Sequence, residues 1–194
     1  MATIYTIGHS TRTFEELVDA LQAHDIRTLV DIRSFPISRR LPHFNRESLE
    51  VELPKHGIAY VWLKELGGRR NKIRNDSPNT GLRNDSFRNY ADYMLTPEFA
   101  QAIEQLLGIV AETAVPSTAP GMTSGEDAGG NTAIMCAERV YFQCHRMLVS
   151  DYLTAHGHKV LHIEDAKRPL RVHMLMAEAR MVDGKLVYNA QKLF

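Results

Sequence analysis

Two cysteines, and the residues directly after the second one, form the part of this sequence best suited to chemistry. The chain has only Cys136 and Cys144, and His145 and Arg146 follow Cys144. The pattern places Cys144 near the start of a helix, whose free N–H groups and positive dipole end bind anions or lower the pKa of a nearby thiol. We therefore expect Cys136 to act as a nucleophile or acid/base, and Cys144, His145 and Arg146 to bind the substrate. The alternative is that both cysteines are small buried hydrophobic residues.

Polar residues also follow the other predicted strands, at the ends where parallel strands meet. His9 is a candidate proton carrier at neutral pH, and Asp31 and Glu138 are candidate general acids or bases. Each carboxylate has an alternative structural role, because it can hold a nearby arginine in place. We expect His9, Asp31 and Cys136 to share one crevice. The residues at these strand ends are His9, Ser10, Asp31, Arg33, Gly67, Gly68, Cys136 and Glu138.

Positive charge gathers in two segments, although Lys+Arg and Asp+Glu both number 23. Segment 33–46 has four arginines and no acid, and segment 69–88 has five arginines and one lysine against two aspartates. Arginine suits bidentate recognition of phosphate, and aromatic residues among the arginines suit stacking on bases. The alternative is a solvated basic surface. The candidate binding residues are Arg33, Arg39, Arg40, Phe44 and Arg69, and the further stacking candidates are Phe35, Phe87 and Tyr90.

Alternating strand and helix patterns predict an α/β fold that brings these strand ends together. Continuous apolar strands that alternate with helices indicate a parallel sheet covered on both faces. We predict a doubly wound, Rossmann-like three-layer sandwich with about five parallel strands, in the order 3-2-1-4-5 or a close variant. Its ligand crevice lies between the first and fourth strands, where the winding reverses. The predicted strands are 3–8, 28–33, 58–63, 132–136 and 159–164.

The rest of the chain is expected to extend this one domain, 1–194. The pattern predicts a helix at 169–180, followed by a hairpin with a type I′ turn at Asp183-Gly184. The segment at about 111–132 is rich in Pro, Gly and small polar residues, which predicts a flexible insertion. Thr13 and Glu16 have the spacing of a capping box.

Composition indicates a soluble globular protein, since 44% of the residues are hydrophobic and 24% are charged. No apolar run approaches the roughly 18 residues that a membrane span needs, and the first residues do not resemble a signal peptide. We expect a cytoplasmic protein with reduced thiols, no membrane partner and no cofactor. The oligomeric state stays open.

A zinc site is a further alternative for the cysteines. Cys136, Cys144 and His145, with His9 as a candidate fourth ligand, have suitable donor atoms. The chain has no C-x2-C pair, however, and adjacent residues on a helix point in different directions. The sequence therefore predicts no metal ligand.

Several ordered motifs resemble those of the Domain of Unknown Function 488 family. The resemblance runs from about Thr3 to Ile163, with similarity again in the closing "LVYNAQKLF". It implies an α/β fold but carries over no established reaction. The motifs are "YTIGHSTRTFEEL", "LVDIRSFPISRRLPHFN", "LKELGGRR", "YADYM" and "MCAERVYFQCHR". The hallmark positions that the resemblance implies are Gly8, His9, Ser10, Asp31, Arg33, Pro36, Ser38, Arg39, Arg40, Pro42, Phe44, Leu66, Gly67, Gly68, Cys136, Glu138, Cys144, His145 and Arg146.

Taken together, these patterns favour an enzyme that acts on a phosphate-bearing substrate, either a nucleotide or nucleic acid. Cys136 is the expected nucleophile or acid/base, His9, Glu138 or Asp31 the proton carrier, and the arginines the anion clamp. The alternatives are a nucleic-acid-binding module without catalysis and a zinc-binding protein.

Overall fold

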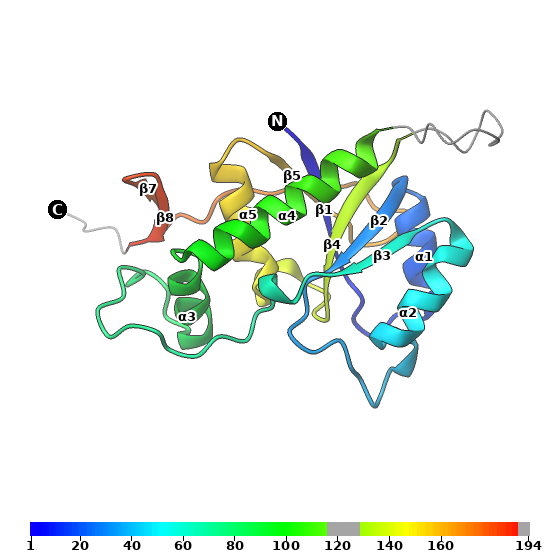
Figure 1. The fold of residues 1–194 in the computed structure, drawn as a ribbon, viewed down its shortest axis with the longest axis horizontal. Helices are drawn as coiled ribbons and strands as arrows, with labels where there is room; N and C mark the ends of the chain where they lie inside the picture. The colour runs from blue at the N-terminus through cyan, green and yellow to red at the C-terminus, as the bar shows by residue number, and fades with distance from the viewer. Residues whose placement is uncertain (116–128, 190–194) are drawn as a thin grey trace.

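A central sheet with helices on both faces forms the body of the protein (Figure 1). The computed structural model describes residues 1–115 and 129–189. The strand order is β3-β2-β4-β1-β5-β6, and all neighbouring strands are parallel except the antiparallel pair β5/β6. The strands of this sheet are β1 (Thr3–Gly8), β2 (Ile26–Asp31), β3 (Ala59–Trp62), β4 (Asn131–Cys136), β5 (Lys159–His162) and β6 (Arg171–Val172).

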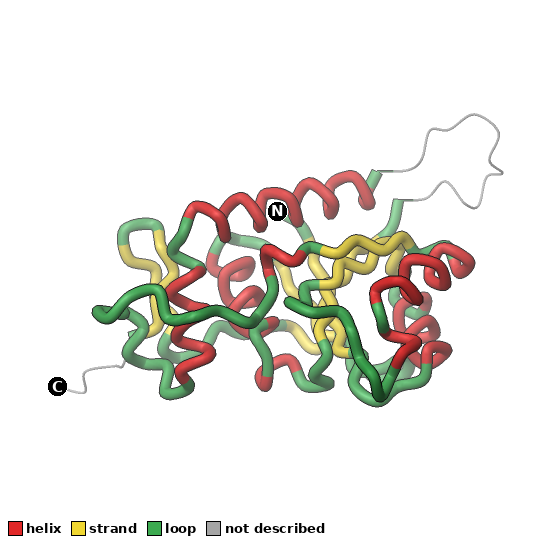
Figure 2. The backbone as a smooth tube through the Cα atoms, turned by 60° about the horizontal axis from the view of Figure 1, so that its bottom comes forward, coloured by secondary structure: helices red, strands yellow, loops and turns green. Residues whose placement is uncertain are grey.

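The helices lie in two layers, one on each side of the strands (Figure 2). Apolar residues of α1 and α2 pack against one face of the sheet, and apolar residues of α3, α4 and α5 pack against the other face. This arrangement confirms the predicted α/β three-layer sandwich. The helices are α1 (Phe14–Gln22), α2 (Arg46–Glu52), α3 (Asp85–Tyr93), α4 (Pro97–Ala114) and α5 (Arg146–Ala155). The short 3-10 turns are η1 (Pro42–Phe44), η2 (Leu53–His56), η3 (Lys64–Leu66) and η4 (Tyr141–Gln143).

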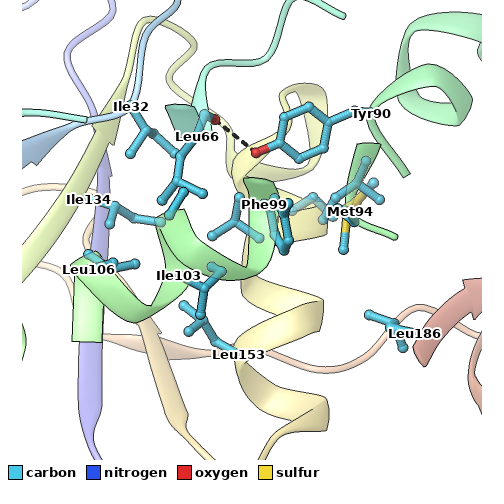
Figure 3. Packing of buried hydrophobic residues seen from close by; sticks show 14 of the residues in the cluster. Ile32, Leu66, Tyr90, Met94, Phe99, Ile103, Leu106, Ile134, Leu153 and Leu186 are labelled. Carbon is cyan, nitrogen blue, oxygen red and sulfur yellow. Dashed lines mark hydrogen bonds between the residues drawn. The ribbon is translucent and has the colours of Figure 1, made fainter. Parts of the chain in front are cut away.

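Local signals explain where the helices of both layers begin. Thr13 accepts a hydrogen bond from the backbone N–H of Glu16, whose side chain accepts one from the Thr13 amide, so the predicted capping box is present. Thr96 caps α4, and Pro97 takes the first turn, where a missing N–H costs nothing. On the α4 side the core is filled by large apolar residues, including Phe99 and Leu106 (Figure 3).

The strand order differs from the predicted 3-2-1-4-5, because β4 lies between β2 and β1. Every residue of β4 after Asn131 is buried. A strand in the centre of the sheet is covered on both faces, and the central position of β4 therefore suits its burial. β1 and β4 are still neighbours, and Gly8 is paired with Cys136. α1 follows β1 on one face and α5 follows β4 on the other. The chains beyond β1 and β4 nevertheless stay hydrogen-bonded, since the Ser10 amide donates to the Ala137 carbonyl at 2.8 Å. The predicted crevice between these two strands is therefore replaced by a cavity at the ends of β2 and β4.

The predicted helix at 169–180 is wrong. Arg171–Val172 pairs with β5 instead, and the chain then continues without helical structure to β7. Asp151 of α5 accepts hydrogen bonds from His173 Nε2 at 2.8 Å and from the Met176 amide at 3.1 Å. These buried tertiary bonds override the local helical pattern, which is a weak preference by itself.

The predicted C-terminal hairpin is confirmed. β7 (Ala179–Val182) and β8 (Lys185–Tyr188) pair antiparallel. Asp183 and Gly184 have φ angles of 48° and 75°, the positive values that a type I′ turn needs. The hairpin is bonded to the loop that precedes α3, because the Gly81 amide donates to the Tyr188 carbonyl at 2.8 Å.

The predicted insertion at about 111–132 overlaps regular structure at both of its ends. Ala111–Ala114 completes α4, and β4 begins at Asn131. The rest of it, 116–128, lies outside the described residues, as does most of the closing motif, 190–194. None of the helices in the described parts of the chain is both long and apolar enough to cross a membrane.

We predict that Asp151→Ala destabilises the protein by roughly 3–5 kcal/mol, because it leaves several buried donors without an acceptor. Tyr188 Oη, at 3.1 Å, is the third donor to this carboxylate, which is fully buried. Urea denaturation measures the change, with Asp19→Ala, on the exposed face of α1, as the control. A loss no larger than that of the control would contradict this role of Asp151.

Candidate functional site

A cavity of about 360 Å³ opens at the carboxyl ends of β2 and β4 and contains both cysteines. Its walls come from five segments: the chain after β2, the chain after η3, the start of α3, the tip of β4 and the start of α5. The predicted site residues that line it are Arg33, Gly68, Arg69, Cys136, Glu138, Cys144 and His145. Two of the predicted stacking candidates, Phe35 and Phe87, also line it, and the other lining residues are Ser34, Ile37, Ser86, Ala137 and Gln143.

His145 is held in one orientation beside Cys136. It is the N-cap residue of α5, and its Nε2 lies 3.0 Å from the carbonyl oxygen of Ile32. A carbonyl only accepts hydrogen bonds, so Nε2 carries a proton, and in the neutral form of a ring protonated there Nδ1 is an acceptor. Nδ1 lies 3.8 Å from Cys136 Sγ. The ring is therefore placed to take a proton from this thiol.

Close packing on both sides of the His145 ring keeps it in place. A Cβ atom on Gly68 would lie 2.7 Å from His145 Cγ, so only glycine fits here. On another side, the Tyr90 ring lies 5.1 Å from the His145 ring, centroid to centroid. Tyr90 is itself fixed, because its hydroxyl donates to the Leu66 carbonyl at 2.8 Å (Figure 3). Tyr90 is thus a buried support of the site rather than the base-stacking residue suggested by its sequence neighbours.

Cys144 accepts hydrogen bonds from a buried arginine. The backbone N–H and the Nε of Arg146 lie 3.4 Å and 3.2 Å from Cys144 Sγ. The Arg146 side chain is 1% exposed and also donates to the Glu138 carbonyl, but among the described residues it has no carboxylate partner. Burial alone would raise the pKa of Cys144, but hydrogen bonding with Cys136 and the charge of Arg146 hold that pKa well below its usual range.

Cys136 has the opposite environment. Its Sγ donates to Glu138 Oε2 at 3.1 Å, and it faces Cys144. Its pKa is raised by hydrogen bonding with Cys144, by burial and by the negative charges of Cys144 and Glu138. The surroundings therefore favour ionisation of Cys144 over ionisation of Cys136.

Asp31 and Arg33 form a buried ion pair at the tip of β2. Arg33 Nε lies 2.9 Å from Asp31 Oδ1, and the hydroxyl of Tyr60 donates to Asp31 Oδ2 at 2.7 Å. The Asp31 side chain is fully buried and does not line the cavity. Its position fits the structural alternative, in which the carboxylate holds Arg33 in place.

His9 also lies at the carboxyl edge of the sheet but does not line the cavity with Cys136. Its Nδ1 donates to the Ser10 carbonyl at 3.0 Å, its Nε2 accepts from Arg33 Nη1 at 3.2 Å, and its ring packs 4.3 Å from that of Phe44. Burial and the charge of Arg33 lower the pKa of His9 to about 4. His9 is therefore a neutral, fully bonded ring at neutral pH.

The remaining predicted binding residues lie outside the cavity wall. Arg39 and Arg40 are exposed, whereas Phe44 is fully buried in the core. The Ser38 amide donates to the Asn45 side chain at 2.6 Å. The Ser10 amide donates to the Ala137 carbonyl at 2.8 Å, and Gly67 allows the close approach of Ser34.

Sequence reasoning missed Ser34, which lines the cavity and accepts a hydrogen bond from the Arg69 amide at 2.9 Å. Its place directly after Arg33, beyond a predicted strand, was a usable signal. Ser86 and Gln143 carried no such signal, because they reach the cavity only through the tertiary fold.

A family model described as "Domain of unknown function DUF488" matches residues 13–118. The matched range includes Arg33, Gly68 and Arg69, and the two cysteines lie beyond it. No curated protein and no solved structure matches the chain.

We predict that Gly68→Ala destabilises the protein by about 1–3 kcal/mol, because the added methyl group overlaps the His145 ring. The control is Gly108→Ala, where the methyl group meets no atom within 4 Å and a helix interior gains about 0.5–1 kcal/mol. Urea denaturation should show a lower free energy of unfolding for Gly68→Ala and a higher one for Gly108→Ala. A change in the same direction for both variants would mean that Gly68 does not hold the His145 ring.

Proposed function

The chain belongs to the DUF488 family, a domain of unknown function, and from this premise we propose that it is an enzyme that uses a cysteine thiolate on a phosphate-bearing substrate. One observation carries the proposal. The buried guanidinium of Arg146 contacts Cys144 Sγ and has no carboxylate partner among the described residues. A buried positive charge needs a negative partner, and the Cys144 thiolate is the group in place to supply it.

The two cysteines have complementary roles in this proposal. Cys144 Sγ attacks the electrophilic centre of the substrate and forms a bond to it. As the bond to the leaving group breaks, the leaving group takes the proton of the Cys136 thiol. Nδ1 of His145 then takes a proton from the water that releases the product from Cys144, and this proton returns to Cys136. The nucleophile is thus Cys144 rather than Cys136, because the Glu138 carboxylate holds the proton on Cys136.

Arg69 supports the choice of a phosphate-bearing substrate. It is exposed on the cavity wall, and no acidic side chain is paired with it in 1–115 or 129–189. The N-terminus of α5 adds positive potential at the same cavity, whereas the charge of Arg33 is balanced by Asp31. In a nucleic-acid substrate, the strand beyond the reacting phosphate would pass the exposed Arg39 and Arg40, which follow Ile37 of the wall.

A binding module without catalysis is the alternative, and it needs only the exposed arginines. It gives no role to a buried thiolate beside a histidine of fixed orientation. Thiol reactivity therefore separates the two functions.

We predict that iodoacetamide labels Cys144 at neutral pH roughly tenfold faster than a free thiol, of which only a few per cent is ionised. The protein is kept in a metal chelator, and the site of labelling is read by peptide mass spectrometry. Cys144→Ser should remove the fast phase. The matched control, Cys136→Ser, should keep it, since serine can still donate to the thiolate. A fast phase that depends on Cys136 instead would reverse the proposed roles, and the absence of any fast phase would refute the enzyme.

We also predict that inorganic phosphate slows this labelling, because it occupies the positive part of the cavity beside the thiolate. Arg69→Ala should raise the phosphate concentration needed for half protection by about three- to tenfold, as expected for the loss of one charge-assisted hydrogen bond. Arg83→Ala is the control, since Arg83 is exposed but does not line the cavity. Equal protection of the wild type and the Arg69 variant would remove Arg69 from the substrate site.

A further inference from the structure

We propose that Cys136, Cys144 and His145 form a zinc(II) site, and that zinc binding and thiolate reactivity exclude each other. The inference goes beyond the proposed function, because it concerns a second ligand of the same side chains and needs no substrate. It also revises the sequence-based expectation that these residues bind no metal.

The three donor atoms already converge. Cys136 Sγ, Cys144 Sγ and one ring nitrogen of His145 lie within 4.8 Å of one another, and all three side chains are buried. Zn–S bonds of about 2.3 Å place two sulfurs roughly 3.8 Å apart around a tetrahedral ion. Small side-chain rotations are therefore enough to close the three ligands around the metal.

The backbone explains why two adjacent residues face the same point. Cys144 is extended, with φ −140° and ψ 169°, and His145 is the cap before α5 begins at Arg146. Because Cys144 is not helical, the divergence of neighbouring side chains on a helix does not apply to Cys144 and His145. The extended turn directs both of them toward Cys136 at the tip of β4.

The groups behind the donors have the arrangement that metal ligands usually have. A metal-bound histidine generally donates its other ring N–H to a carbonyl or carboxylate, and His145 Nε2 donates to the Ile32 carbonyl. That bond leaves Nδ1, the nitrogen facing Cys136, free to bind. Cys144 Sγ accepts two N–H groups of Arg146, which stabilise a thiolate ligand. These contacts orient two of the three ligands before any metal arrives.

The donor atoms indicate which metal the site would bind. Two sulfurs and one imidazole nitrogen favour zinc over magnesium or calcium, which prefer oxygen ligands. Zinc would bind both cysteines as thiolates and His145 through Nδ1, and any proton still held by either thiol would leave on binding. Glu138, which lines the cavity and lies 3.1 Å from Cys136 Sγ through its Oε2, is the available fourth ligand, and water is the alternative. Both sulfurs are then bound to the metal, and neither is a free nucleophile.

Cobalt(II) and zinc(II) titrations of the metal-free, full-length protein test the site. We expect one cobalt ion per chain, with the thiolate-to-metal absorption bands of a tetrahedral site, and displacement of cobalt by zinc. Cys136→Ser, Cys144→Ser and His145→Gln should each weaken zinc affinity at least tenfold, as measured against a chromophoric chelator. His156→Gln, at an exposed histidine, should not change it. Zinc should also stop iodoacetamide labelling, and a chelator should restore it.

Two results would overturn the zinc site: a wild-type cobalt spectrum without thiolate bands, or the same zinc affinity in the three ligand variants as in the wild type. The wild-type spectrum decides the matter even if a variant fails to fold. The proposed function fails separately. Slow labelling of Cys144 in chelator refutes the enzyme while the cobalt bands still support the metal site, and fast labelling without cobalt bands does the reverse.

Discussion

The buried positive charge of Arg146 is the constraint on which the site depends. Its side chain is 1% exposed, and among the described residues the acidic groups lie too far away to pair with it. Removing an unpaired charge from water costs several kcal/mol, so the surrounding groups must compensate. They do so with the Cys144 sulfur and the Glu138 carbonyl, and the contact also depends on Gly8, since a side chain there would overlap Glu138 and Arg146. The ends of β1 and β4 and the start of α5 are thus joined by one side chain, whose charge also lowers the pKa of Cys144.

Much of the fold followed from local patterns. The strand 3–8, the capping box of α1 and the turn at Asp183-Gly184 were predicted from apolar runs and turn residues. The order of the strands and the course of 169–180 were not, because both depend on which surfaces bury most area against distant parts of the chain. Asp151 illustrates the difference, since its bonds to His173 and Met176 leave no mark in the sequence around either residue.

The sequence placed several candidate residues at one edge of the sheet, but it did not indicate their bonding partners. Cys136 and Glu138, which follow from a predicted strand end, line the cavity at that edge. The sequence could not show that His9 is bonded to Ser10 and Arg33 and packed on Phe44, or that Asp31 is committed to Arg33. Nor could it show that Cys144 lies before the helix rather than in it. Such details depend on side-chain partners supplied by other segments of the chain.

The central claim is that Cys144 is ionised at neutral pH because it balances Arg146. The most direct measurement is the ultraviolet absorption of the thiolate, taken as the difference between the wild type and Cys144→Ser in the presence of a chelator. The account predicts that this difference already corresponds to one thiolate per chain at neutral pH. If the absorption instead appears only as the pH rises through the pKa of a free thiol, about 8.5, Cys144 is an ordinary thiol and the account is wrong.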